Sequence, residues 1–119
     1  MQEIKVNIFE LISSHAAVAT DDGNKLYDRI NKIFKSKNKV VLDFNNIELI
    51  TSTFLNSSIG RLYGHYDSNF IKEHLSINNL NDDDLLLLKK VVERAKEYFT
   101  QKEKMEKGIR ETLENEEDN

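Results

Sequence analysis

Three adjacent hydroxyl residues, Thr51, Ser52 and Thr53, form the stretch of this sequence best suited to chemistry. They follow a short apolar run and precede apolar residues at helical spacing, which places them at the start of a helix. A hydroxyl there accepts a hydrogen bond from an orphaned backbone amide, a role that needs only one of the three. A phosphate there would be held by helix amides and would change the surface charge by about two. The pattern leaves two interpretations, a helix cap and a phosphorylation switch.

Asp43 is a second candidate because it directly follows the apolar run Val40–Leu42. A wholly apolar run is typical of a strand that is buried on both faces of a parallel sheet. Open α/β folds build their binding sites at the carboxyl ends of such strands. The alternative is an acid that caps a turn at Asn45 or Asn46, because Asp and Asn commonly form turns.

The remaining polar residues supply no catalytic set. The three histidines, His15, His65 and His74, lack the spacing of metal ligands, and the sequence contains no cysteine. The run Asp82–Asp84 suits a helix start and lacks the glycine and distal glutamate of a calcium loop. We find neither a glycine-rich phosphate loop nor a nucleophile elbow. We therefore expect no enzymatic activity, no metal and no cofactor.

Composition narrows the class of partner. The 119-residue length suits one compact domain, and the net charge of −4 comes without a basic cluster. Nucleic-acid binders normally carry a basic stripe, so we expect no nucleic-acid partner. No apolar run approaches the roughly 20 residues of a membrane helix, and the amino terminus lacks a signal-peptide pattern. These features favour a cytoplasmic protein that does not bind membranes.

The amino-terminal third predicts two strands and a helix. Residues 4–8 alternate apolar and polar side chains, and residues 9–12 are taken as an extension of this strand. The small apolar run at 16–19 suggests a second strand that pairs with the first as a hairpin. Asp21 and Asp22 are expected to cap the helix that follows. Its apolar stripe is Leu26, Tyr27, Ile30, Ile33 and Phe34.

The rest of the chain alternates strands and helices. After the strand at 40–42, a short extended piece at 47–50 leads into a helix that ends at Gly64. Residues 74–78 predict another strand, and Asn81 with the acids after it starts a long helix. The apolar stripe of this helix is Leu85, Leu88, Val92, Ala95 and Phe99.

The aliphatic residues become sparse after this stripe. We therefore divide the chain into a domain of residues 1–100 and a charged segment of residues 101–119. The segment is either a solvated helical extension or a flexible acidic tail.

The stretch VVLDFNNIELITSTFLNSSIGRLYG, residues 40–64, resembles a STAS-like family of bacterial and phage proteins of unknown function. The preceding block AVATDDGNKLYDRI and the following block INNLNDDDLLLLKKVVERAK resemble the flanking blocks of that family in the same order. The resemblance extends over about residues 4–96. It implies an α/β fold with a small mixed β-sheet and helices packed on it, to which this chain adds a long carboxyl-terminal helix.

That family is in turn similar to STAS domains that act as anti-sigma factor antagonists. In those antagonists an Asp-Ser-Ser-Gly-Leu motif follows the strand, and a partner kinase phosphorylates its second serine. The resemblance places Thr51 to Leu55 on this motif and Thr53 on the phosphoacceptor position. Thr51 replaces the Asp of the motif, and Phe54 replaces its Gly.

The resemblance implies a non-enzymatic regulatory module that binds a protein partner, such as an ATPase-type kinase or another regulator. The candidate phosphoacceptors are Thr53 and Ser52. The predicted partner-binding residues are Asp43, Asn45, Thr51, Ser52, Thr53, Asn56 and Ser57. Two alternatives stay open: an assembly protein that forms a homodimer through its long last helix, and a sensor that binds a small ligand or nucleotide at Asp43.

Overall fold

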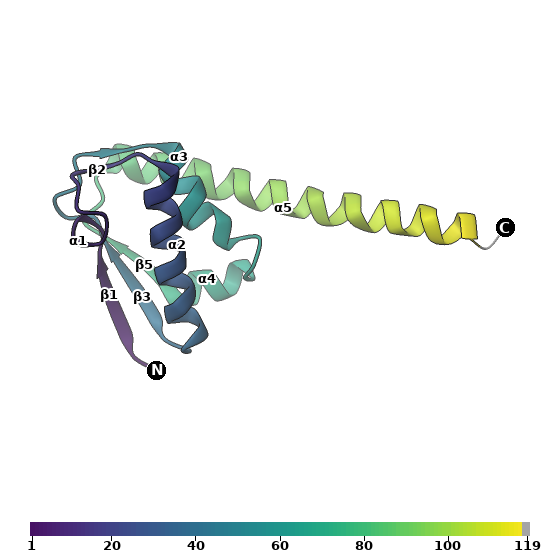
Figure 1. The fold of residues 1–119 in the computed structure, drawn as a ribbon, viewed down its shortest axis with the longest axis horizontal. Helices are drawn as coiled ribbons and strands as arrows, with labels where there is room; N and C mark the ends of the chain where they lie inside the picture. Colours follow the sequence, from purple (N-terminus) through teal and green to yellow (C-terminus); the bar gives the residue numbers. More distant parts are fainter. Residues whose placement is uncertain (118–119) are drawn as a thin grey trace.

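A three-stranded parallel sheet with helices packed on one face forms the body of the molecule in the computed structural model (Figure 1). The structure describes residues 1–117, with side chains described to Leu113; the last two residues of the predicted charged segment lie outside the described residues. The strands are β1 (Glu3–Asn7), β2 (Ala16–Ala17), β3 (Lys39–Asp43), β4 (Leu49–Ile50) and β5 (Leu75–Asn78). The helices are α1 (Ile8–Ile12), α2 (Thr20–Lys35), α3 (Ser52–Leu55), η1 (Asn56–Gly60), α4 (Ser68–His74) and α5 (Asp82–Glu117).

The main sheet has the order β1-β3-β5, and β2 pairs separately with β4. The predicted α/β class with helices packed on a small sheet is confirmed. Every pairing is parallel, however, where a mixed sheet was expected. The reason is that helices lie between the paired strands along the chain, and a chain that crosses over through helices returns in the same direction.

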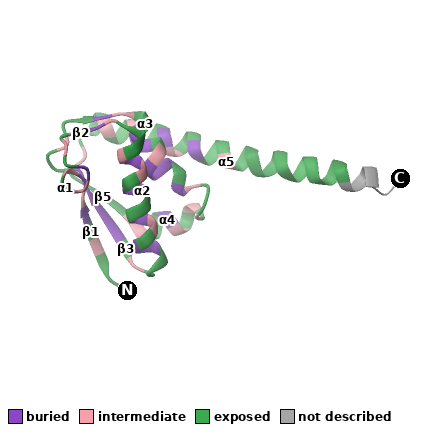
Figure 2. Ribbon diagram, in the orientation of Figure 1, coloured by how far each residue is buried: buried purple, intermediate pink, exposed green. Residues whose placement is uncertain are grey.

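Side-chain alternation decides which face of the sheet the helices cover. Ile4, Val40 and Leu75 lie side by side on the three strands, and their side chains face the apolar core. The residues two positions later on each strand face the same way. The central strand β3 is buried from Val40 onward, as its apolar run predicts (Figure 2). Helices α2 and α4 lie against it, and α5 packs farther from the sheet, on the helix that begins at Ser52.

The residues after β1 form a helix, so the predicted extension of the strand over residues 9–12 was wrong. Asn7 Oδ1 accepts a hydrogen bond from the Glu10 amide (2.9 Å) and caps α1. Ser13 ends α1 with a left-handed φ of 57°. This turn carries the chain away from β1, so β2 pairs with β4 and the predicted hairpin was also wrong.

The predicted helix stripe of α2 is confirmed, since all five of its apolar residues are buried. The predicted capping residues of α2, Asp21 and Asp22, do not cap the helix. The helix begins at Thr20, and the residue before it, Ala19, makes no side-chain cap. Asp21 and Asp22 lie in the first turn, where they interact favourably with the positive end of the helix dipole.

Gly23 in the first turn of α2 sets how closely α2 approaches the helix that begins at Ser52. A Cβ atom on Gly23 would lie 1.7 Å from Ser57 Oγ and 2.8 Å from the Phe54 carbonyl oxygen. Only a residue without a side chain fits there. The close approach buries the apolar faces of both helices, including Phe54 and Leu26.

We predict that Gly23→Ala lowers the free energy of unfolding by about 1–3 kcal/mol, because the added methyl group overlaps backbone and side-chain atoms of the facing helix. Gly108→Ala in α5 is the matched control, since no heavy atom lies within 4 Å of a Cβ there. Helix propensity leaves that variant unchanged or more stable by up to about 1 kcal/mol. Urea unfolding followed by circular dichroism measures both. Equal stability of wild type and Gly23→Ala would contradict the close approach.

Candidate functional site

Thr51 is the residue of the hydroxyl triplet that caps the helix. Its Oγ1 accepts a hydrogen bond from the Phe54 amide (3.2 Å) and donates one to the Val18 carbonyl (2.9 Å). Its backbone amide also donates to the Ala17 carbonyl (3.1 Å). Thr51 therefore satisfies an orphaned helix amide and ties the helix start to the segment after β2.

Ser52 and Thr53 are exposed at the start of the same helix. Neither hydroxyl makes a hydrogen bond to any residue that the structure describes. Asn56, one turn farther along, is exposed as well, and the half-buried Ser57 donates to the Phe54 carbonyl (3.1 Å). Four of the predicted partner-binding residues are thus gathered along one stretch of helix at the surface.

The helix widens into a π-helical turn, η1, which begins at Asn56 and includes Ser57. Ser58 in this turn is fully buried and donates a hydrogen bond to the Phe54 carbonyl at 2.7 Å. A hydroxyl that bonds back to a carbonyl four residues earlier competes with the regular helix hydrogen bond. Turns of π-helix inside α-helices often occur at functional sites. No spacing rule in the sequence predicts this turn.

An arginine-lined groove borders the same stretch of helix and lies between it and α5. We call it the arginine groove; its volume is about 540 Å³. Its lining residues are Asn24, Asn56, Ser57, Gly60, Arg61, Arg94, Ala95, Tyr98 and Phe99. The Arg61 guanidinium lies 3.9 Å from the centre of the Tyr27 ring, a cation–π contact that holds it in place. Sequence reasoning missed both arginines, because they are far apart in the chain and belong to no motif.

Asp43 lies elsewhere, at the carboxyl end of β3, and is buried. Its Oδ1 accepts hydrogen bonds from the Asn79 side chain (2.8 Å) and from the Asn45 amide (3.0 Å). Its Oδ2 lies 3.2 Å from Lys5 Nζ, whose side chain stays largely in solvent. We call Asp43, Lys5, Asn45 and Asn79 the strand-end clamp, because they join β1, β3 and the turn after β5.

The clamp keeps Asp43 ionised. The hydrogen bond from Asn79 is the strongest influence that lowers the pKa of the Asp43 carboxyl. Burial acts in the opposite direction, and the Asn45 amide and Lys5 add to the lowering. Asp43 thus caps a turn at Asn45, as the alternative interpretation of this residue predicted. Its hydrogen bonds and its ion pair involve Asn45, Asn79 and Lys5 and none of the hydroxyl triplet. Asn45 itself is exposed.

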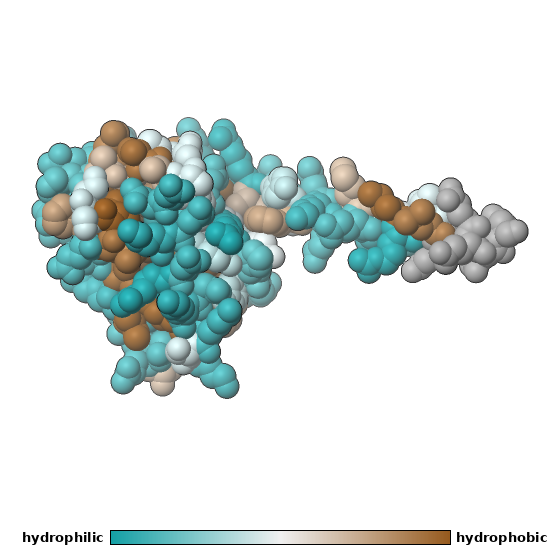
Figure 3. Space-filling model, viewed as in Figure 1, coloured by the Kyte–Doolittle hydropathy of each residue, from teal (hydrophilic) through white to brown (hydrophobic). Residues whose placement is uncertain are grey.

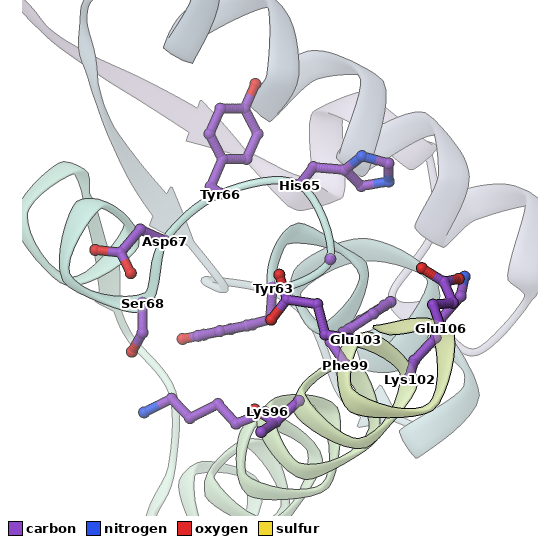
Figure 4. Close-up of a pocket in the computed structure, with 12 residues that line it drawn as sticks. Tyr63, His65, Tyr66, Asp67, Ser68, Lys96, Phe99, Lys102, Glu103 and Glu106 are labelled. Atoms are coloured by element: carbon purple, nitrogen blue, oxygen red, sulfur yellow. The ribbon is translucent and has the colours of Figure 1, made fainter. Parts of the chain in front are cut away.

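A second cleft, of about 690 Å³, lies where α5 leaves the body, between α5 and residues 63–68 (Figure 4). Tyr63 lies between the loop and α5, with Lys96 Nζ 5.7 Å from its ring centre, and burial raises its pKa. Tyr66 points away, toward α2, where its hydroxyl donates to Asn31 Oδ1. Cations and carboxylates both line this cleft, so its charge favours no single class of ligand.

The parallel sheet and the strand-to-helix junction after β4 define a small α/β protein of the STAS-like class. The chain matches the STAS-like domain of unknown function (DUF4325) over residues 22–85 and belongs to that family, which confirms the resemblance. The match begins in α2, ends in α5 and includes the hydroxyl triplet. No curated protein and no solved structure matches the chain. Among the helices described, none has the length and apolar character that crossing a membrane requires.

We predict that Asp43→Asn lowers the free energy of unfolding at pH 7 by about 1–3 kcal/mol, because a buried charged partner of Lys5 and Asn79 is lost. The folded-state pKa of Asp43 lies below the ordinary 3.8, so its contribution is present above that pH. The difference from wild type therefore shrinks as the pH falls below 3.8 and through the lower folded-state value. Chemical unfolding at several pH values measures this. Asp28→Asn, at an exposed position of α2, is the control.

We predict that Thr51→Val, which keeps the shape but removes both hydrogen bonds, costs about 1–2 kcal/mol of stability. Ser52→Ala is the adjacent control and stays within about 0.5 kcal/mol of wild type, since its hydroxyl is exposed. Thermal unfolding compares the two. If Ser52→Ala were the more destabilised variant, the cap would belong to Ser52 and not to Thr51.

Proposed function

We propose that this protein is a non-enzymatic regulatory module that binds a protein partner and that phosphorylation at the start of the Ser52 helix controls this binding. The observation that supports this proposal best is that the three residues of the hydroxyl triplet differ in their structural roles. Thr51 supplies the cap, whereas Ser52 and Thr53 are exposed and take no part in capping the helix. Membership in a STAS-like family agrees with such a role.

A phosphate at this position is physically favourable. The first turn of the helix carries partial positive charge from unsatisfied amides, which stabilises an anion there. Phosphorylation adds about two negative charges to a surface that also presents Asn56. Phe54, which departs from the antagonist motif, is fully buried, so its ring does not cover the neighbouring Thr53.

The sensor alternative gains less support. A ligand at Asp43 would have to reach a buried carboxylate whose two oxygens already have three partners, Asn79, Asn45 and Lys5. The exposed hydroxyls present no such obstacle. We therefore assign the predicted partner surface to Ser52, Thr53, Asn56 and Ser57, and give Asp43 the role of holding the strand ends together.

The test captures partners from lysate of the native host with wild type, Thr53→Ala and Thr53→Glu, and maps phosphate on Ser52 and Thr53 by mass spectrometry. We expect phosphate on one of these residues and a change of about tenfold in partner recovery between the two variants. Thr100→Glu, an exposed position on α5, is the charge control and behaves as wild type. Partner recovery that is equal for both Thr53 variants, together with no phosphate on Ser52, would refute the switch.

A further inference from the structure

The arginine groove brings together two cations from segments that are far apart in the chain. Arg61 directly follows η1, whereas Arg94 belongs to α5, which packs against η1. Both arginines line the same hollow of about 540 Å³, a size typical of binding sites for small organic molecules. None of the described residues that line it is acidic. Two positive charges therefore border a space that contains no compensating carboxylate.

The ring of Tyr27 holds one of these cations in place. The Arg61 guanidinium lies over this ring, 3.9 Å from its centre, and Tyr27 itself is buried. Within the part of the chain that the structure describes, the side chains of Arg61 and Arg94 make no hydrogen bond and no ion pair, so their N–H groups are available. A cation that is already held in place loses less conformational freedom when an anion binds to it.

The π-helical turn forms the side of the groove that faces α5. Gly60 at the end of this turn is buried, and a Cβ atom there would lie 3.3 Å from Val91 Cγ1, so η1 and α5 are in close contact at this point. Asn24 and Asn56 also line the groove. Their side-chain amides make no hydrogen bond to a described residue, and each adds N–H donors to those of the arginines.

Two aromatic rings of α5 complete the lining of the groove. Tyr98 is 60% exposed, Phe99 is half-buried, and their ring centres lie 5.0 Å apart in an edge-to-face arrangement. Ala95, one turn earlier on α5, is buried and lines the groove as well. The groove thus combines apolar surface, on which a flat ring packs well, with a set of hydrogen-bond donors.

We propose that the arginine groove binds a small organic anion in which a phosphate or carboxylate is attached to an aromatic ring. The oxyanion accepts charge-assisted hydrogen bonds from Arg61 and Arg94, and a side-chain amide of Asn24 or Asn56 donates to an oxygen that the arginines leave free. The aromatic part of the ligand lies against the rings of α5.

Charge selects this class of ligand. The chain carries a formal net charge of −4, so most of its surface repels anions, whereas the groove has two arginines and no acid among its described lining residues. A neutral or cationic ligand would leave both guanidinium groups without an acceptor. An anion without an apolar part would leave the aromatic side of the groove in contact with water.

The groove is a separate site from the proposed switch. It includes Asn56 and Ser57 but neither Ser52 nor Thr53, so ligand binding does not require phosphate at the helix start. Failure of the Thr53 test would leave this site standing, and failure of ligand binding would leave the switch standing.

An NMR titration of the ¹⁵N-labelled full chain tests the proposal with four probes: phenyl phosphate, benzoate, inorganic phosphate and phenol. We expect phenyl phosphate or benzoate to bind with a Kd of about 1 mM or lower, which is ordinary for a probe of this size. Binding is expected to shift the backbone amide signals of Gly60 and Ala95 and the side-chain N–H signals of Arg61 and Arg94. Inorganic phosphate lacks the ring and phenol lacks the charge, so each is expected to bind about fivefold more weakly or worse.

Arg94→Gln removes one cation and is expected to raise the Kd of phenyl phosphate about tenfold or more. Arg110→Gln is the matched control and keeps the wild-type Kd. Arg110 is an exposed arginine of the same helix, about 24 Å beyond Arg94 at the ordinary rise per residue, on the part of α5 that projects from the body (Figure 3). Both arginines are at exposed helix positions, so both variants are expected to fold, which circular dichroism checks.

Absence of saturable binding by both aromatic anions would overturn the proposal, and so would equal affinity of wild type and Arg94→Gln for phenyl phosphate. Inorganic phosphate that binds as tightly as phenyl phosphate would reduce the groove to a simple anion site. Phenol that binds as tightly would reduce it to an apolar one. A short phosphotyrosine peptide that binds about tenfold more tightly than phenyl phosphate would assign the groove to a modified protein and overturn the small-molecule proposal.

Discussion

The approach of α2 to the Ser52 helix at Gly23 is the contact on which the rest of the molecule depends. A side chain at this position would meet the Phe54 carbonyl and Ser57 Oγ at distances that no packed structure tolerates. With glycine there, the two helices bury a shared apolar layer over the sheet, and α5 can pack on the outer side of that layer. The same contact places Asn24 beside Asn56 and Ser57, which creates one wall of the arginine groove.

Polar residues have two separate roles in this fold. The strand-end clamp joins three parts of the chain through a buried carboxylate whose oxygens are all engaged. In the hydroxyl triplet, in contrast, only Thr51 makes hydrogen bonds that hold the fold, and the other two side chains are exposed. Burial and partner number distinguish the two roles: a polar group with complete hydrogen bonding inside the fold is held there, whereas an exposed hydroxyl is available to a partner.

Much of the architecture is predictable because local patterns agree with the tertiary structure. The apolar run at Val40–Leu42 becomes the buried central strand, and the α2 stripe becomes its cover. The residues after β1 misled the prediction because Ile8 and Ile12 suit both a strand and a short helix, and the Asn7 cap decided between them. The order of strands could not be predicted from periodicity, since pairing partners are chosen by tertiary packing.

The candidate site was predictable only where its residues are neighbours in sequence. Thr51, Ser52 and Thr53 are adjacent, so their common position at a helix start follows from capping rules. Asp43 was found from its strand, but its partners Lys5 and Asn79 come from segments before and after it, which only the fold brings together. Arg61 and Arg94 likewise meet at one groove because α5 packs beside the Ser52 helix.

The all-parallel sheet also determines how the chain can reach its native state. Glu3 pairs with Lys39 and Val40 pairs with Leu75, so each ladder joins segments about 35 residues apart. No hairpin exists in the main sheet from which it could grow locally. One long loop must close before each ladder forms, and loop closure of this kind slows folding more than it weakens the folded state. The helices can form early, but the sheet is complete only after the central strand β3 has paired with both β1 and β5.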